Sequence, residues 1–476
     1  MAEQQCKYTK VIDYIRQGID SRVWQHDEKL PSIRQLSQQL GVSKNTIIRA
    51  YHTLEARGII TANARSGYRV VYQKMKPSNN SIPRSISLLS MCKDVLAKPS
   101  PEERLNLGTA HPNISTPAIN SLYAEIGRHS RRQTHSHSHY QLPPGNQELT
   151  YQFKNLSNDL GLTVSQHEIT VTHGAQQGIS LALRAVTKPG DTVIVESPCY
   201  FGNLLLMESL GLKVIEISSS PVTGIDVSAV SNAINKWDVS AVLVTPNFMN
   251  PTGAQMPLNA RIELLRVSNN IPIIEDDVFG ALGFNQPIPP IHALDSNKRV
   301  IYINSLSKVL DSRLRIGWVI AGRYQEVIER QLFCDTMGST NLMQSAVADF
   351  LKSGRYRSHV KKMNRYYQNA MQTFYEELTQ RLDRSHYLYK NYQLTVPTGS
   401  FLLWLELPKV FDGLAAYQQA REQRISILPG HLFATSGQYK HCLRFSCSNY
   451  MLNSHWNSGL DQLVELIDTQ LRDRQC

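Results

Sequence analysis

The sequence contains no uninterrupted apolar run of about 18 residues or more, so it predicts no membrane-spanning helix. The first residues, Met1 to Gln5, are polar and lack the apolar core of an export signal, and we therefore expect a cytoplasmic protein. The seven cysteines are scattered and never form a CxxC pair, which disfavours a disulfide framework and a zinc site. Neither a GxGxxG run nor a Walker loop occurs, so no nucleotide fingerprint is present.

The chain is long, and its positive charge is unevenly distributed along the sequence. Its 476 residues exceed one ordinary core and predict roughly two to three structural units. Of the net charge of +11, residues 1–76 contribute +7, with 13 Lys and Arg against 6 Asp and Glu. A basic terminal module is typical of nucleic-acid binding, although a solvated basic surface would have the same composition.

Three segments follow from the sequence pattern. Residues 1–72 are basic and helix-rich, and residues 73–104 are rich in Pro, Ser and Asn, as a linker would be. Residues 105–476 alternate short Val/Ile runs with helical patterns, which predicts an α/β domain with a mostly parallel sheet covered on both faces. The predicted strands are Ile169–Thr172, Thr192–Val195, Ala241–Thr245, Ile271–Ile274 and Val300–Ile303.

The first segment has the helix pattern of a small DNA-binding fold. Apolar residues recur at helical spacing from Tyr8 to Ile19, and Ser32 with Gln35 predicts a capping box that begins a second helix. A turn at residues 41–43 precedes a third helix. Its core-facing residues are Ile47, Tyr51 and Leu54, which leaves exposed polar side chains suited to base edges and phosphates at Lys44, Asn45, Thr46 and Arg49.

Residues 7–72, with a predicted β-hairpin wing at 58–61 and 68–71, resemble the GntR-type winged helix. The resemblance is carried by Leu30-Pro31-Ser32, Arg34, Leu36, Gly41-Val42-Ser43, Thr46, Ala50-Tyr51, Leu54-Glu55 and Gly58. The wing departs from the family, because Arg65-Ser66-Gly67-Tyr68 replaces the commoner Gly-Ser-Gly-Thr. The resemblance implies double-stranded DNA as a partner. The predicted DNA-binding residues are Arg34, Ser43, Lys44, Asn45, Thr46, Arg49, Ser66 and Gly67.

In the third segment, chemically useful residues follow the predicted strands. Lys308 comes shortly after Val300–Ile303 among small hydroxyl residues, a setting suited to a Schiff base. Gly174, Ala175 and Gln176 follow Ile169–Thr172 and open a helix, whose free N–H groups form an anion site. Further predicted phosphate ligands are Ser305, Ser307 and Arg315.

Pyridoxal phosphate requires this combination of an amine, a phosphate cradle, an acid and an aromatic plate. Asp276 is predicted to pair with the ring nitrogen of the cofactor, and Tyr200 to stack on the ring. Asn250 is predicted to bond the ring hydroxyl, and Arg444 to hold an effector or substrate carboxylate by a bidentate fork.

Residues from about 105 to 465 resemble the fold-type I aminotransferases. Eight motifs occur in family order: Gly174-Ala175-Gln176-Gln177-Gly178, Pro189-Gly190-Asp191, Glu196-Ser197-Pro198-Cys199-Tyr200, Asn250-Pro251-Thr252-Gly253, Glu275-Asp276-Asp277, Ser305-Leu306-Ser307-Lys308, Arg315-Ile316-Gly317-Trp318 and Leu443-Arg444-Phe445-Ser446. Joined to a GntR-type head, this architecture is similar to the MocR family of regulators. That resemblance implies pyridoxal phosphate as a ligand and a head-to-tail homodimer, with Tyr140 reaching the phosphate of the neighbouring subunit.

Two positions depart from the aminotransferase pattern. Phe279 stands where the family usually has a tyrosine that donates to the ring hydroxyl, and Thr150 stands where an arginine is common. The lost hydrogen bond is worth roughly 1 kcal/mol, so we expect binding to survive and any catalysis to change more. His135, His137 and His139 alternate with serine, so in an extended segment they would share one face and could bind a metal. A polar loop leading to Tyr140 is the favoured interpretation, and no metal is predicted.

Three functions remain compatible with the sequence. The chain is interpreted as a DNA-binding regulator modulated by pyridoxal phosphate or by an amine that reacts with it. It could alternatively be an active aminotransferase carrying a DNA-binding head, in which Lys308 acts as general acid and base. A regulator whose large domain serves only as a dimerisation scaffold is the third. The winged helix favours regulation, because a metabolic aminotransferase has no need of it.

Overall fold

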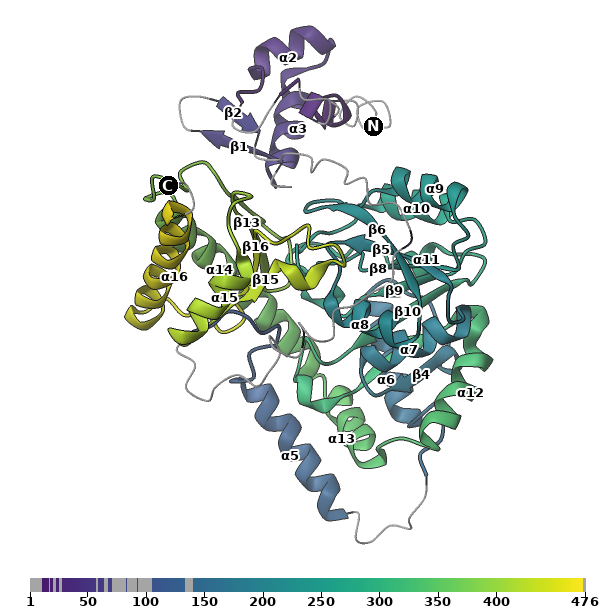
Figure 1. Cartoon of the computed structure of the whole chain (residues 1–476). Helices are drawn as coiled ribbons and strands as arrows, with labels where there is room; N and C mark the ends of the chain where they lie inside the picture. Colours follow the sequence, from purple (N-terminus) through teal and green to yellow (C-terminus); the bar gives the residue numbers. More distant parts are fainter. Residues whose placement is uncertain are drawn as a thin grey trace. The chain divides into compact units, whose positions relative to one another are not determined.

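The computed structural model describes residues 11–16, 18–19, 23–24, 28–56, 59–63, 67–70, 83, 92, 105–132 and 140–473. The chain divides into two compact units, Met1–Pro77 and Ser78–Cys476, and each is described by itself (Figure 1). The predicted linker, residues 73–104, lies outside the described residues apart from Pro83 and Cys92. No helix of the described ranges is long and apolar enough to cross a membrane.

The first unit is a small helical domain with one hairpin. Residues 11–16 and 18–19 are helical, and they are followed by α2 (Ile33–Leu40) and α3 (Lys44–Ala56). The predicted capping box of α2 is present, because Ser32 Oγ accepts from the Gln35 amide and Gln35 Oε1 accepts from the Ser32 amide. α2 ends at Gly41, whose φ of +63° is favourable for glycine. The buried side chains of this unit include Val11, Ile15, Leu36, Ile47 and Leu54.

The hairpin consists of β1 (Ile60–Asn63) and β2 (Gly67–Val70), paired antiparallel as predicted for a wing. The amide of Ala62 donates to Glu55 Oε1 at 2.8 Å and ties the hairpin to the end of α3. The predicted wing residue Ser66 lies outside the described residues, whereas Gly67 begins β2 with a φ of +90°.

The second unit is built on an eight-stranded sheet in the order β4-β11-β10-β9-β8-β5-β6-β7. Four neighbouring pairs, from β10 through β6, are parallel, and the pairs β10–β11, β11–β4 and β6–β7 are antiparallel. The sheet is therefore mostly parallel, as predicted. Its strands are β4 (Ile169–Thr172), β5 (Thr192–Ser197), β6 (Lys213–Ser220), β7 (Gly224–Ile225), β8 (Ala241–Val244), β9 (Ile273–Asp276), β10 (Val300–Ser305) and β11 (Gly317–Ile320).

Helices cover both faces of this sheet. Val300 of β10 belongs to a buried cluster with Val230 of α9 and Leu264 of α10. Ile303, three residues further along the strand, contacts the position of Gly178 on α7, so α7 lies on the opposite face. The flanking helices include α6 (Gln147–Asp159), α7 (Ala175–Val186), α8 (Phe201–Ser209), α9 (Val227–Lys236), α10 (Leu258–Val267), α11 (Ile291–Leu294) and α12 (Gln325–Thr336).

A smaller antiparallel sheet, in the order β12-β13-β16-β15, forms the C-terminal part of the second unit (Figure 1). Its strands are β12 (Gln393–Leu394), β13 (Leu402–Glu406), β15 (Leu428–Pro429) and β16 (Cys442–Ser446), and it is accompanied by α15 (Gly413–Glu422) and α16 (Ser454–Asp473). Near the start of the unit, β3 (Leu105–Asn106) pairs in parallel with β14 (Ile425–Ser426) from the C-terminal part.

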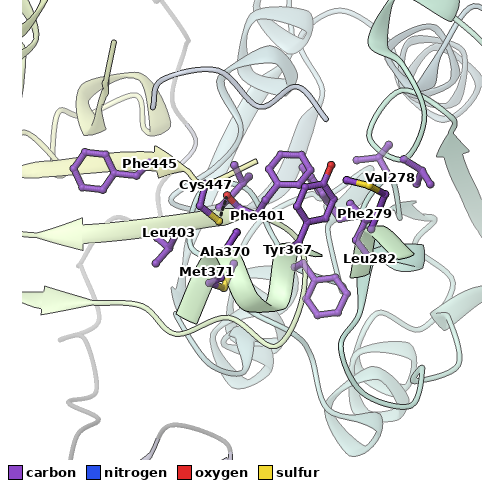
Figure 2. Close-up of a cluster of buried hydrophobic side chains, with 14 of the residues drawn as sticks. Val278, Phe279, Leu282, Tyr367, Ala370, Met371, Phe401, Leu403, Phe445 and Cys447 are labelled. Atoms are coloured by element: carbon purple, nitrogen blue, oxygen red, sulfur yellow. Dashed lines mark hydrogen bonds between the residues drawn. The ribbon is translucent and has the colours of Figure 1, made fainter. Parts of the chain in front are cut away.

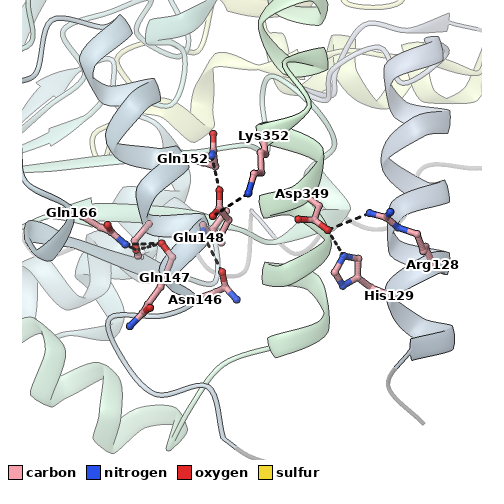
Figure 3. Close-up of polar contacts among 11 residues, drawn as sticks. Arg128, His129, Asn146, Gln147, Glu148, Gln152, Gln166, Asp349 and Lys352 are labelled. Atoms are coloured by element: carbon pink, nitrogen blue, oxygen red, sulfur yellow. Dashed lines mark hydrogen bonds and ion pairs between the residues drawn. The ribbon is translucent and has the colours of Figure 1, made fainter. Parts of the chain in front are cut away.

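Three further helices join the layers: α5 (Pro117–Arg132), α13 (Asn341–Lys352) and the long α14 (Arg355–Leu382). Figure 3 shows how α13 holds its neighbours through polar contacts. Asp349 of α13 accepts from Arg128 at 3.2 Å and contacts His129 Nε2 at 3.0 Å, both on α5. Lys352 pairs with Glu148 of α6 at 3.6 Å. These contacts join α13 to α5 and α6.

Candidate functional site

Lys308 lies three residues beyond the end of β10 and is half-buried. Its ammonium donates to the carbonyl oxygen of Ala110 at 3.0 Å, across 198 residues of sequence. Burial, reinforced by the positive charge of Arg444, lowers the pKa of Lys308 to about 8, although Asp276 acts in the opposite direction. About a tenth of this amine is therefore uncharged at pH 7, far more than for a free lysine, and the uncharged form is the nucleophile.

Asp276 is the last residue of β9 and is buried. Burial raises the pKa of its carboxyl to about 7, although hydrogen bonds from the Val278 amide and from the Asn203 side chain act to lower it. Asn203 lies on α8, is buried, and was missed by the sequence reasoning because no motif marks it. Its Oδ1 atom has no partner among the described residues. The hydrogen bond from the Asn203 side chain favours the ionised form of the carboxyl that is predicted to face the ring nitrogen.

The beginnings of α7 and α8 lie side by side. Gln176 Nε2 donates to the carbonyl oxygen of Gly202 at 2.9 Å, two residues beyond Tyr200, which precedes α8. Burial raises the pKa of Tyr200, and the charges of Asp276, Arg444 and Arg315 all act on its hydroxyl. Tyr200 is thus within electrostatic reach of both Asp276 and Arg444.

The residues of the predicted anion site lie where α7 begins. Gly174 precedes the helix with a φ of +78° and no side-chain cap, so the first helical N–H groups are available to a ligand. A Cβ atom on Gly174 would lie 2.8 Å from Arg315 Nη2, and one on Gly317 would lie 2.8 Å from the Gly174 carbonyl carbon. Ser305 pairs with Gly317 across β10 and β11, which brings its strand end to the same place. Glycine is required at both positions for this close approach.

Arg444 lies on β16 of the smaller sheet and is almost completely buried, with 2% of its surface exposed. Its Nη2 donates to the carbonyl oxygen of Gly108, and burial lowers the pKa of the guanidinium to about 10. The segment from Gly108 to Ala110 therefore binds both Arg444 and Lys308 through backbone oxygens. This strap carries no sequence motif and was not predicted.

The buried donor and acceptor set is incomplete without a polar ligand. Asn250 Oδ1, Ser307 Oγ and Arg444 Nε are buried and have no hydrogen-bond partner among the described residues. Buried polar atoms are normally bonded. An amine, a carboxyl, an anion cradle and unpartnered polar atoms fit a phosphorylated pyridine aldehyde.

The position of Phe279 is apolar, as its substitution for tyrosine suggests. Its ring packs edge-on against Phe401 with centroids 5.8 Å apart, and Lys308 Nζ lies 5.9 Å from its centroid. Figure 2 shows it beside Tyr367 and Leu282 in a cluster of buried hydrophobic side chains. Tyr140, by contrast, is 75% exposed in the single chain.

The predicted DNA-binding side chains form an exposed set on the first unit. Arg34, Lys44, Asn45 and Arg49 are exposed, and Thr46 is half-buried. The hydroxyl of Ser43 accepts from the Thr46 amide at 3.2 Å, so it caps α3. The start of α3 therefore presents two cations and one amide to solvent.

Comparison with known proteins covers both units. Residues 7–70 match the gntR family of bacterial regulatory proteins, and residues 106–453 match the class I and II aminotransferases, which depend on pyridoxal phosphate. Two Escherichia coli K12 relatives span nearly the whole chain. The HTH-type transcriptional regulator YjiR is 33% identical over 97% of this chain and 98% of its own length, and YdcR is 31% identical over 98% and 99%.

Solved structures share the fold of the second unit. The α-aminoadipate aminotransferase LysN of Thermus thermophilus has a TM-score of 0.70 and 23% identity, covering 80% of this chain and 94% of its own. The multiple-substrate aminotransferase of Thermococcus profundus has a TM-score of 0.71 and 20% identity, covering 83% and 98%. These comparisons confirm the predicted fold and the resemblance stated above. The chain belongs to the HTH-type transcriptional regulators in which a GntR-family winged helix is joined to a class I and II aminotransferase domain, the MocR arrangement.

Proposed function

We propose that this regulator binds pyridoxal phosphate at Lys308, and that the cofactor, or an amine that reacts with it, changes the affinity of the winged helix for DNA. The observation that carries the proposal is the Lys308 amine, whose pKa is lowered to about 8 beside Asp276 and Arg444. When bound, pyridoxal phosphate supplies an aldehyde that condenses reversibly with primary amines and a ring that withdraws electrons.

Each residue of the site has a part in this proposal. The N-terminus of α7, at Gly174, Ala175 and Gln176, would hold the phosphate together with Ser305, Ser307 and Arg315. Asp276 would hold a proton on the ring nitrogen, Tyr200 would cover the ring, and Asn250 would bond its hydroxyl. Arg444, with a buried and unpartnered Nε, would orient the carboxylate of an amino-acid-like effector.

The exposed Tyr140 supports a homodimer in which this residue completes the neighbouring phosphate site. A head-to-tail dimer would also carry two winged helices, which suits two DNA half-sites. A ligand changes DNA affinity only if it binds two states of the protein differently. Exchange at Lys308 offers such a difference, because it frees or engages the amine that holds Ala110.

A footprint on the DNA upstream of the protein's own gene tests the coupling. We expect a protected site whose affinity or pattern changes with pyridoxal phosphate in the wild type and does not change in Lys308→Ala, which lacks the amine. The visible absorption band of the bound cofactor should also be absent from the variant. Protection that ignores the cofactor in the wild type, with the band present, would contradict the coupling while leaving cofactor binding intact.

The rate at which Lys308 captures the cofactor should depend on pH, and the profile should reflect the lowered pKa of Lys308. Capture requires the uncharged amine, so the rate should rise about tenfold per pH unit below pH 7 and level off above about pH 8 to 9. For a lysine with an ordinary pKa, the capture rate would continue to rise up to about pH 10. Stopped-flow absorbance over this range measures the profile. Arg444→Gln removes a positive charge that lowers the pKa of Lys308, so the plateau of this variant should begin at a higher pH. An unchanged profile would show that Arg444 does not contribute to the lowered pKa.

Catalysis is the second candidate function, because the amine, the carboxyl and the guanidinium of a transaminase site are all present. Lys308 would then also move the substrate proton. Phe279 removes a hydroxyl donor and favours regulation over turnover. Steady-state transamination with several amino donors separates the two, since sustained turnover supports the enzyme and its absence supports the regulator.

A further inference from the structure

A cavity of about 440 Å³ lies in the same unit, and none of its lining residues belongs to the predicted cofactor site. Its walls come from residues 280–290, which directly follow Phe279, and from the first half of α14. Asp277, Asn304 and Trp318 line its inner end and are buried. A volume of this size is within the range of small-molecule sites, roughly 300–1,000 Å³.

The cavity and the candidate cofactor site use opposite sides of the same strands. Successive side chains of a strand point to opposite faces, so Asn304 and Ser305 at the end of β10 diverge. Asn304 lines the cavity, whereas Ser305 does not and is predicted to bind the phosphate. The cavity is therefore distinct from the predicted cofactor site.

Two buried polar atoms of the lining have no partner in the part of the chain that the structure describes. They are Nε1 of Trp318, a donor on a side chain that is 2% exposed, and Oδ1 of Asn364, an acceptor. The amide nitrogen of Asn364 is already used, because it donates to the carbonyl oxygens of Ala281 and Gly283 at 3.0 and 3.1 Å. The lining therefore offers one unmet donor and one unmet acceptor.

The lining includes two carboxylates, both of which have partners: Asp277 accepts from Asn247 and Tyr302, and Asp159 is paired with Arg357. The other lining side chains include aromatic and basic residues. Phe248 and Tyr356 are buried, and Phe284 is partly buried. Of the charged residues at the rim, Arg357 is paired with Asp159 at 2.7 Å. Lys361 and Arg365 are exposed and form no ion pair within the described ranges. Two uncompensated positive charges thus stand at the entrance of an aromatic cavity.

We propose that this cavity binds a small organic anion with a planar ring, its acceptor facing Trp318 and its negative group facing Lys361 and Arg365. The ring would pack against the aromatic walls, and a donor on the ligand would satisfy Asn364 Oδ1. This ligand is distinct from the cofactor and from any amine that reacts at Lys308.

Calorimetric titration of the full chain, loaded with pyridoxal phosphate, tests the proposal with 5-hydroxyindole-3-acetate as the probe, because its hydroxyl can accept from Trp318 while its ring N–H donates to Asn364. We expect one saturable site per chain, with affinity about fivefold or more above that for the uncharged 5-hydroxyindole-3-acetamide at low salt. Trp318→Phe keeps an aromatic ring but removes the donor, and it should weaken the probe about fivefold. Lys361→Gln and Arg365→Gln should each weaken it about threefold, in a salt-dependent manner.

Lys362→Gln is the matched control, because Lys362 is exposed on the same helix turn but does not line the cavity, and it should bind as the wild type does. Arg444→Gln tests whether the probe enters the cofactor site instead, and it should leave the affinity unchanged. The proposal is overturned if no binding is seen at millimolar probe, or if only Arg444→Gln weakens it. Equal weakening by Lys362→Gln and Lys361→Gln would also overturn it. Because the exposed lysine and arginine variants leave the core intact, a folding defect of Trp318→Phe would not decide the outcome.

Discussion

Asp276→Asn should lower the affinity for pyridoxal phosphate by about a hundredfold or more. The carboxyl is buried at the end of β9, where it accepts a hydrogen bond from Asn203 and is close enough to Lys308 to influence its pKa. A protonated ring nitrogen facing this carboxyl would favour its ionised form. Removing one partner of such a buried charged pair costs roughly 3–5 kcal/mol, because the other charge is left uncompensated. Each 1.4 kcal/mol is about tenfold in affinity. Asparagine has nearly the same shape as aspartate, so the loss of cofactor affinity would measure the contribution of the negative charge.

Titration of the visible band at neutral pH measures this change. Glu196→Gln is the matched control, because Glu196 is also a buried carboxyl near Asp276 and its Oε2 accepts from the Thr245 amide at 2.8 Å. Glu196 is not predicted to face the ring nitrogen, and glutamine keeps an oxygen that can accept from the Thr245 amide, so this variant should change the affinity less than about threefold. Equal effects of the two variants would show that Asp276 has no special relation to the cofactor ring.

Much of the candidate site could be predicted because it sits at the ends of strands that have a local signature. Lys308 follows β10, Asp276 ends β9, and the Gly174 turn follows β4, all within two residues of the predicted positions. The strand predicted at Ile271–Ile274 is displaced to Ile273–Asp276. Ile271 instead closes a turn, since its amide bonds the Ser268 carbonyl at 2.8 Å. The apolar run was clear, but its register depended on the neighbouring strands.

What the sequence could not supply are contacts between distant segments. The Gly108–Ala110 strap reaches Lys308 across 198 residues and Arg444 across 336, and nothing near residue 108 indicates either bond. Asn203 is similar, because its partner Asp276 lies on another element. The smaller sheet was not anticipated either, since β12 and β15 are two residues long and too short for a period of two to appear. Local pattern predicts the elements, whereas packing decides which polar atoms meet.

The winged helix should lose DNA affinity when either cation at the start of α3 is removed. Lys44 and Arg49 are exposed, and the Ser43 cap sets the start of the helix that carries them. A base-edge contact is worth about 1–3 kcal/mol, so Lys44→Ala and Arg49→Ala should each weaken specific binding about tenfold. The double variant should lose about a hundredfold if the two contacts are independent. Gel-shift titration on the footprinted site, repeated at several salt concentrations, measures both the loss and its dependence on salt.

The salt dependence separates the kinds of contact. Loss of a phosphate contact lowers the slope of log affinity against log salt by about one, and binding to unrelated DNA weakens in parallel. Loss of a base contact leaves that slope nearly unchanged and relaxes sequence preference. Lys213→Ala, which removes one exposed positive charge from the start of β6 in the second unit, controls for net charge and should bind DNA as the wild type does. Both α3 residues lie in the unit Met1–Pro77, so their variants should keep the cofactor band. A variant that loses the band but keeps its DNA affinity would refute the assignment of DNA binding to the first unit and cofactor binding to the second.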